Sequence, residues 1–252
     1  METSSSNDNF ADGYDGALYS VYKSIINPYI AYTLYPMASM TLGLIVASLH
    51  HDWDWTIWMV AMAHMWFYDE GMKSVDLSAD DINLDVNSNI QFTIGVLMIL
   101  TGFSLAVVLA NMTTIWYIPF VLFLTSLGFA YNLEWFDGIL HDRQYVTGWG
   151  NLAFCLGWAP AVCGYILLAE RISLGIIVFA IGPMLVKGTM GWIEEDMKDK
   201  LYEIKGIKHE RPTPTDVDRM KRRSLISQLL NIASFIAMAV GLIIELNYIG
   251  VL

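Results

Sequence analysis

Acidic residues recur at helical spacing just after an apolar run in the second half of the chain. Asp196, Asp199 and Glu203 fall at offsets of 0, 3 and 7 residues, which places them on one face of a helix. Carboxylates so placed can hold a hard divalent cation such as Mg²⁺, which keeps its waters for exchange with phosphate oxygens. The interleaved lysines also favour a simpler interpretation, a solvated helix end with local Glu–Lys pairs.

A second acidic segment follows an apolar run in the first half of the chain. Asp69 and Asp76 are seven residues apart, so they share one face if the helix continues through them. Both acidic segments begin where an apolar run ends, which predicts that they lie at one depth. Together they could hold Mg²⁺, although charged residues at the end of an apolar helix are commonplace.

A third polar segment combines carboxylates with a histidine. Glu134, Asp137 and His141 fit one helical face. Facing Glu and His side chains build di-metal sites in helix bundles, so iron or manganese is an alternative cofactor. The full candidate set is Glu134, Asp137, His141, Glu194 and Glu195, with Asp69 or Glu70. A hydrated helix end that pairs with Arg143 is the simpler interpretation.

Three ionisable residues lie within apolar runs, where charge is costly and side chains usually face the interior or the interface. Lys187 precedes Glu194 by seven residues, so it is expected on the same face two turns away and could neutralise a phosphate or a carboxylate. Glu245 lies near the end of the last run and is expected to reach water. His64 is either a hydrogen-bonded core residue or a ligand.

The composition indicates which elements must position these residues. The chain has 252 residues, of which 55% are hydrophobic and only 15% charged, and its mean hydropathy is +0.45. A bilayer span needs roughly 20 mainly apolar residues. Such runs occur at 27–49, 55–72, 91–111, 114–133, 148–169, 174–193 and 225–250. We expect an all-α polytopic membrane helical bundle of about seven transmembrane helices, in a single domain at 23–252 that follows a polar acidic tail at 1–22.

Charge is distributed unevenly between the two faces of this expected bundle. With the N-terminus inside, the inner segments hold all of the 14 Lys and Arg residues except Lys187, within a run, and Arg171, outside. The positive-inside rule therefore predicts a cytoplasmic N-terminus and an external C-terminus. The net charge of −11 argues against nucleic acid as a partner, and the basic cluster at 219–223 suits anionic lipid headgroups.

The order of these elements over residues 23–224 resembles the UbiA-type intramembrane prenyltransferases. The first run opens with Asn27-Pro28-Tyr29 and continues to Leu34-Tyr35-Pro36, and Gly148-Trp-Gly150 opens the fifth. The segment Asp196-Met-Lys-Asp199-Lys-Leu-Tyr-Glu203, followed by Gly206, is similar to the family's second motif, DxxDxxxD and Gly. In the first motif, NDxxDxxxD, Asp69 and Asp76 match, whereas Tyr68 and Met72 occupy the other two positions.

The resemblance implies a UbiA-like fold and a definite chemistry. Asp69 and Asp76 would hold one Mg²⁺ on an isoprenyl diphosphate, and the 196–203 motif would hold another. Cations would assist the departing diphosphate, and a membrane-soluble lipid or aromatic acceptor would capture the allylic cation. The candidate cations are Lys187, Lys198 and Arg143.

The residues also allow two other functions. The third polar segment favours a membrane di-metal carboxylate oxidase. Tyr68 and Met72 favour a non-catalytic membrane subunit that keeps the fold and acts with a membrane protein partner.

Overall fold

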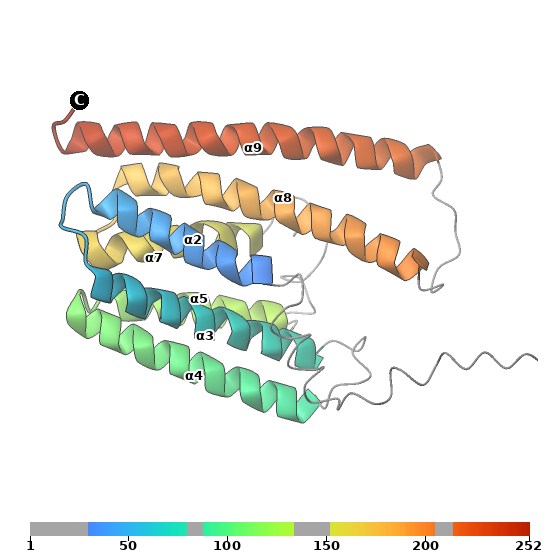
Figure 1. Ribbon diagram of the computed structural model, residues 1–252, viewed down its shortest axis with the longest axis horizontal. Coiled ribbons are helices and arrows are strands. Elements are labelled where there is room, and N and C mark those ends of the chain that lie inside the picture. Colours follow the sequence, from blue (N-terminus) through green and yellow to red (C-terminus); the bar gives the residue numbers. More distant parts are fainter. Residues whose placement is uncertain (1–29, 80–87, 134–151, 205–213) are drawn as a thin grey trace, which may run out of the picture.

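The computed structural model describes the backbone of residues 30–79, 88–133, 152–204 and 214–252. Within these ranges the chain forms seven α-helices and no strand (Figure 1). The helices are α2 (Ile30–Ala47), α3 (Trp55–Ala79), α4 (Ser88–Met112), α5 (Tyr117–Asn132), α7 (Leu152–Ala169), α8 (Leu174–Ile204) and α9 (Pro214–Tyr248). The expected all-helical fold is confirmed for this part of the chain.

Consecutive helices run in opposite directions, so the bundle has two distinct ends (Figure 1). The short turns at 48–54, 113–116 and 170–173 lie at one end, together with the C-terminus. We call this the outer end. The opposite end, which we call the inner end, holds the last turns of α3, α5 and α8.

Three helices extend well beyond the apolar runs that predict them. α3 continues through Asp69 and Asp76, and α8 continues through the acidic segment to Ile204. The residues in these extensions include Lys, Glu, Met and Leu, which have high helix propensity. α9 begins at Pro214, a residue suited to the first position of a helix because its missing N–H needs no partner there.

Close contact between α2 and α7 depends on glycine. A Cβ on Gly43 would lie only 1.8 Å from the carbonyl oxygen of Ala161, and one on Gly164 would lie 2.0 Å from that of Met40. The two backbones therefore touch, which brings many atom pairs into van der Waals range. Small residues at helix crossings are typical of membrane bundles.

α9 packs along α8 at the edge of the bundle (Figure 1). Gly241 lies against the backbone of Phe179, and Gly182 receives the Met238 side chain. The outward face of α9 is apolar and exposed. On this face, 70% of the Phe235 surface is accessible to solvent. The other exposed members of this face are Leu225, Ile226, Leu229, Ile232, Ile236, Val240 and Ile243.

Large apolar side chains are also exposed on other helices. Ile94, Leu97 and Leu100 of α4 and Phe123 of α5 all face outward. Among the described residues, two helical segments are long and apolar enough to cross a membrane, Asn89–Met112 and Leu225–Tyr248, and four shorter apolar helices accompany them. The structure thus shows an all-helical bundle with two helices that could be membrane spans.

Candidate functional site

The inner half of the bundle holds a charged group centred on Asp69 of α3. Lys73 lies one turn further along α3, with its Nζ 2.7 Å from Asp69 Oδ2 and 3.2 Å from Glu70 Oε1. All three side chains are largely buried. The Lys187 ammonium of α8 is close enough to act electrostatically on the Asp69 carboxylate. Asp69 and Lys187, both predicted site residues, therefore lie within electrostatic range of each other on separate helices.

Lys187 is placed by its own helix and by α2. Its Nζ lies 5.9 Å from the centre of the Tyr35 ring, within range of a cation–π interaction. The Tyr35 hydroxyl donates a hydrogen bond to the carbonyl oxygen of Pro183, one turn before Lys187. This contact ties α2 to α8 beside the lysine, so the Lys187 charge lies between α2, α3 and α8.

The two residues that depart from the resemblance lie against α4 and α5. Met72 is buried, and its Sδ and Cε atoms lie 3.2 and 3.0 Å from the point where a Cβ on Gly128 would be. The backbone and Cβ of Tyr68 similarly pack on Gly102 of α4. Met72 and Tyr68 thus fill the space between α3, α4 and α5. Asp76, the other matching position, is half-buried near the end of α3.

The second acidic motif is described by its backbone alone. α8 is unbroken through positions 196, 199 and 203, so these positions repeat at the predicted helical spacing. The side chains of Glu194, Glu195, Asp196, Lys198, Asp199 and Glu203 lie outside the described part of the structure. Glu134, Asp137, His141 and Arg143 also lie outside it.

Metal binding stays a prediction. Among the side chains that are described, no three or more His, Cys, Asp or Glu residues are grouped so that they could hold a metal ion. The acidic side chains of α8 are needed to complete either of the predicted metal sites.

His64 is a hydrogen-bonded core residue, one of the two alternatives that the sequence leaves open. It is 2% exposed, and its Nδ1 lies 2.8 Å from the carbonyl oxygen of Gly102. The ring centres of Tyr68 and Tyr117 are each 5.9 Å from that of His64. His64 therefore links α3 to α4.

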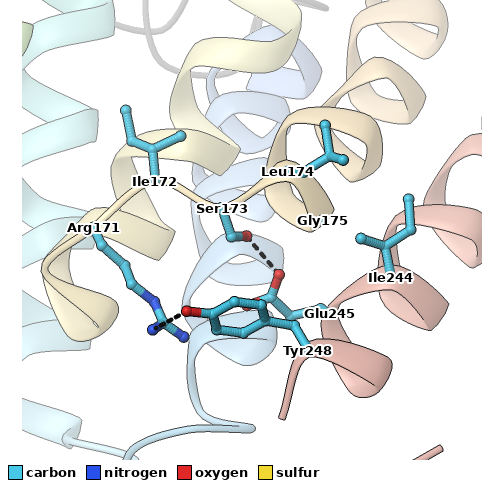
Figure 2. Close-up of a pocket in the computed structure, with 8 residues that line it drawn as sticks. All are labelled: Arg171, Ile172, Ser173, Leu174, Gly175, Ile244, Glu245 and Tyr248. Carbon is cyan, nitrogen blue, oxygen red and sulfur yellow. Dashed lines mark hydrogen bonds between the residues drawn. The ribbon is translucent and has the colours of Figure 1, made fainter. Parts of the chain in front are cut away.

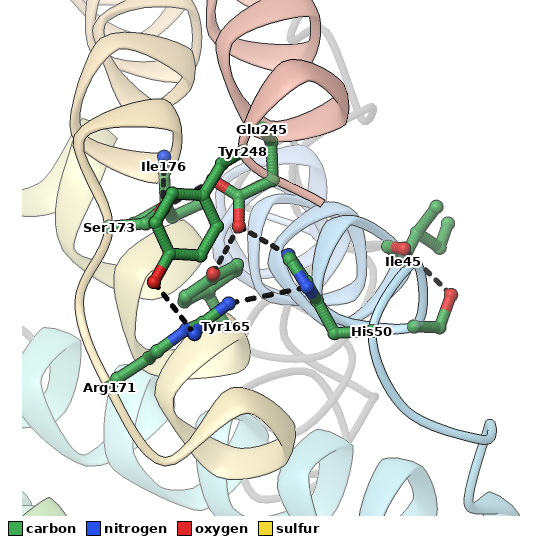
Figure 3. Close-up of polar contacts among 9 residues, drawn as sticks. Ile45, His50, Tyr165, Arg171, Ser173, Ile176, Glu245 and Tyr248 are labelled. Atoms are coloured by element: carbon green, nitrogen blue, oxygen red, sulfur yellow. Dashed lines mark hydrogen bonds and ion pairs between the residues drawn. The ribbon is translucent and has the colours of Figure 1, made fainter. Parts of the chain in front are cut away.

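Glu245 does not reach water, which corrects the expectation from the sequence. Its side chain is fully buried at the outer end of α9. Oε1 lies 2.5 Å from His50 Nε2 and accepts a hydrogen bond from the Tyr165 hydroxyl, while Oε2 accepts one from Ser173 Oγ at 2.5 Å (Figure 3). Three donors from separate parts of the chain replace the water that a carboxylate otherwise needs.

Arg171 completes this group on the solvent side. Its Nη1 donates to the Tyr248 hydroxyl at 3.3 Å, and its guanidinium carbon lies 4.7 Å from the centre of the Tyr248 ring (Figure 2). Its hydrogen bond with Tyr165 raises the pKa of Arg171, which keeps the side chain cationic. A cavity of about 250 Å³ adjoins it. The cavity is lined by Arg171, Ile172, Ser173, Leu174, Gly175, Ile244, Glu245 and Tyr248.

The sequence signals only part of this outer group. Glu245 is conspicuous as a carboxylate in an apolar run, whereas its partners His50, Tyr165 and Ser173 belong to segments far apart in the chain. No spacing rule connects them, so only the fold brings them together.

No family model, no curated protein and no solved structure matches the chain.

Proposed function

We propose that the protein is a polytopic membrane protein whose inner end faces the cytoplasm. The exposed apolar faces of α4, α5 and α9 support this proposal, since water would be a poor solvent for so much exposed apolar surface. The glycine contacts between α2 and α7 are of the kind found between membrane helices. The orientation rests on the positive-inside rule, because the sequence has most of its Lys and Arg residues in the segments 69–91, 134–148 and 194–224.

Within this bundle we propose a divergent UbiA-like prenyltransferase. It would transfer an isoprenyl group from an isoprenyl diphosphate to a lipid or aromatic acceptor in the membrane. The observation that carries the proposal is that Lys187 of α8 lies within electrostatic range of Asp69 of α3. From these residues both helices continue into acidic segments at the same end of the bundle.

The donor set fits a hard cation. Asp69 and Asp76 on α3 would face the motif at 196–203 on α8, and carboxylate oxygens are the ligands that Mg²⁺ prefers. When bound, Mg²⁺ would neutralise charge that develops on the diphosphate as it leaves.

Lys187 has a position suited to the leaving group. It lies between three helices, and in a site that excludes water its ammonium would stabilise negative charge on the diphosphate strongly. The bond between the allylic carbon and the diphosphate oxygen breaks, the acceptor attacks the resulting carbocation, and the acceptor then loses a proton. Lys198 and Arg143 stay further candidates for this role.

One observation favours a second candidate. Met72 and Tyr68 occupy two positions of the first motif and pack against α4 and α5 instead of supplying ligands. A non-catalytic subunit that keeps the fold would have this arrangement. Such a subunit would show neither binding of an isoprenyl diphosphate with Mg²⁺ nor turnover.

Turnover in reconstituted vesicles tests the proposal. With geranylgeranyl diphosphate, Mg²⁺ and an extract of membrane lipids as acceptors, we expect Mg²⁺-dependent release of diphosphate. Asp196→Asn and Asp199→Asn should each reduce this rate on the order of 100-fold, the usual effect of losing one electrostatic stabiliser. Glu170→Gln is the matched control, because Glu170 is exposed in the turn at the outer end.

Two results would contradict the proposal. One is an absence of Mg²⁺-dependent binding or release with the folded wild-type protein. The other is an undiminished rate in both aspartate variants. Iron or manganese retained by the purified protein would instead support the di-metal oxidase.

A further inference from the structure

The outer polar cluster, defined as His50, Tyr165, Arg171, Ser173 and Glu245, joins α9 to α2 and α7, on which α9 does not otherwise pack extensively (Figure 3). His50 lies in the turn after α2, Tyr165 in α7, and Arg171 and Ser173 in the turn before α8. α9 packs extensively on α8 alone among the described helices. Glu245 is thus the point at which the outer end of α9 is fixed to α2 and α7.

His50 lies between a carboxylate and a guanidinium. Its Nε2 is 2.5 Å from Glu245 Oε1, and its Nδ1 is 3.2 Å from an Nη atom of Arg171. A guanidinium can only donate hydrogen bonds, and it stays charged in proteins. Nδ1 must therefore accept from Arg171, which leaves the ring proton on Nε2, where it is donated to Glu245. The two partners together select one neutral tautomer of His50.

A second proton on His50 is compatible with one partner only. Protonated Nδ1 becomes a donor that faces the donor of Arg171, and two cations then lie in contact. The bond from Nε2 to Glu245 survives and becomes an ion pair. Acid therefore removes the contact with Arg171 and strengthens the contact with Glu245.

The other titratable groups around His50 do not offset this change. Tyr165 donates its proton to Glu245, and the Tyr248 ring already lies under Arg171. His51 is the nearest other histidine, with its ring centre 6.3 Å from that of His50, and it is exposed to solvent.

We propose that His50 is a protonation-sensitive latch on the outer face of the protein. In its neutral form it holds Arg171 across the turn between α7 and α8. In its protonated form it repels the guanidinium, and Arg171 keeps its contacts with Tyr248 beside the adjoining cavity of about 250 Å³. This latch involves none of the residues of the inner site. The two proposals, the latch and prenyl transfer, can therefore fail independently of each other.

Nitrogen NMR of the protein in nanodiscs, labelled at His and Arg, tests the latch. At about pH 8 we expect His50 as the Nε2–H tautomer. When acid adds the second proton to the ring, the Arg171 side-chain signals should shift together with those of His50. His50→Gln should abolish the shift, because glutamine can donate to Glu245 and accept from Arg171 but takes up no proton. His51→Gln is the matched control and should leave the shift as in the wild type.

The proposal is overturned if wild-type His50 carries its proton on Nδ1 at about pH 8. It is equally overturned if Arg171 does not respond while His50 titrates. Both readouts come from the wild-type protein, so the test holds even where His50→Gln reduces stability.

Discussion

Replacing Gly43 with valine is expected to prevent α2 from packing on α7. A Cβ at this position would lie 1.8 Å from the carbonyl oxygen of Ala161 and 2.8 Å from its carbonyl carbon, both backbone atoms of a buried helix. Neither atom can move without displacing α7. Overpacking in a well-filled core costs typically 1–3 kcal/mol, and a backbone clash at this distance should exceed about 3 kcal/mol. Thermal unfolding in detergent, followed by circular dichroism, measures the loss.

Gly128→Ala is the control for this change. The new Cβ would lie 3.0 and 3.2 Å from the Cε and Sδ atoms of Met72, the flexible end of a long side chain, and 3.7 Å from the Tyr68 hydroxyl, which is ordinary van der Waals contact. A small shift of Met72 accommodates it, so the thermal midpoint should change little. If Gly43→Val unfolds at the same temperature as Gly128→Ala, the close crossing of α2 and α7 is wrong.

Glu245→Ala is expected to have the second large effect. This single substitution removes the acceptor for three donors, the His50 ring N–H and the hydroxyls of Tyr165 and Ser173. Each buried donor left without a partner costs about 1–3 kcal/mol, so the free energy of unfolding should fall by roughly 3 kcal/mol or more. Hydrogen exchange should rise at the outer end of α9, because its attachment to α2 and α7 is lost.

Glu170→Gln provides the comparison for Glu245→Ala. Glu170 lies in the adjacent turn and is exposed, so removing its charge should leave stability within about 0.5 kcal/mol. Equal exchange rates in α9 for the two variants would show that Glu245 does not fix this helix.

Much of the fold can be predicted from the sequence, because apolar runs of span length alternate with short and long polar segments. The helix ends cannot, since charge ends an apolar run without ending a helix. The positions of Asp69 and Asp76 in α3, and the extension of α8 to Ile204, show this difference. Lys, Glu and Met residues continue a helix into water as readily as within a bundle.

The candidate site, like the fold, could be predicted from the sequence only in part. Helical spacing places Lys187 on a face of its own helix, and the structure adds that its electrostatic partner includes Asp69 of α3. The role of Met72 as a packing residue also required the structure, because the sequence shows only that a carboxylate is missing there. The cluster around Glu245 could not be found by spacing, since its members meet only through tertiary contacts.

We propose above that α3 and α8 hold one metal–diphosphate site at the inner end. Manganese in place of magnesium makes this site visible by electron–nuclear double resonance, through the coupling of bound Mn²⁺ to the phosphorus of geranylgeranyl diphosphate. We predict a phosphorus-coupled signal in the wild-type protein that is lost in Asp69→Asn and, separately, in Asp196→Asn, because each helix supplies ligands. A signal that persists in both variants would contradict a shared site on these two helices.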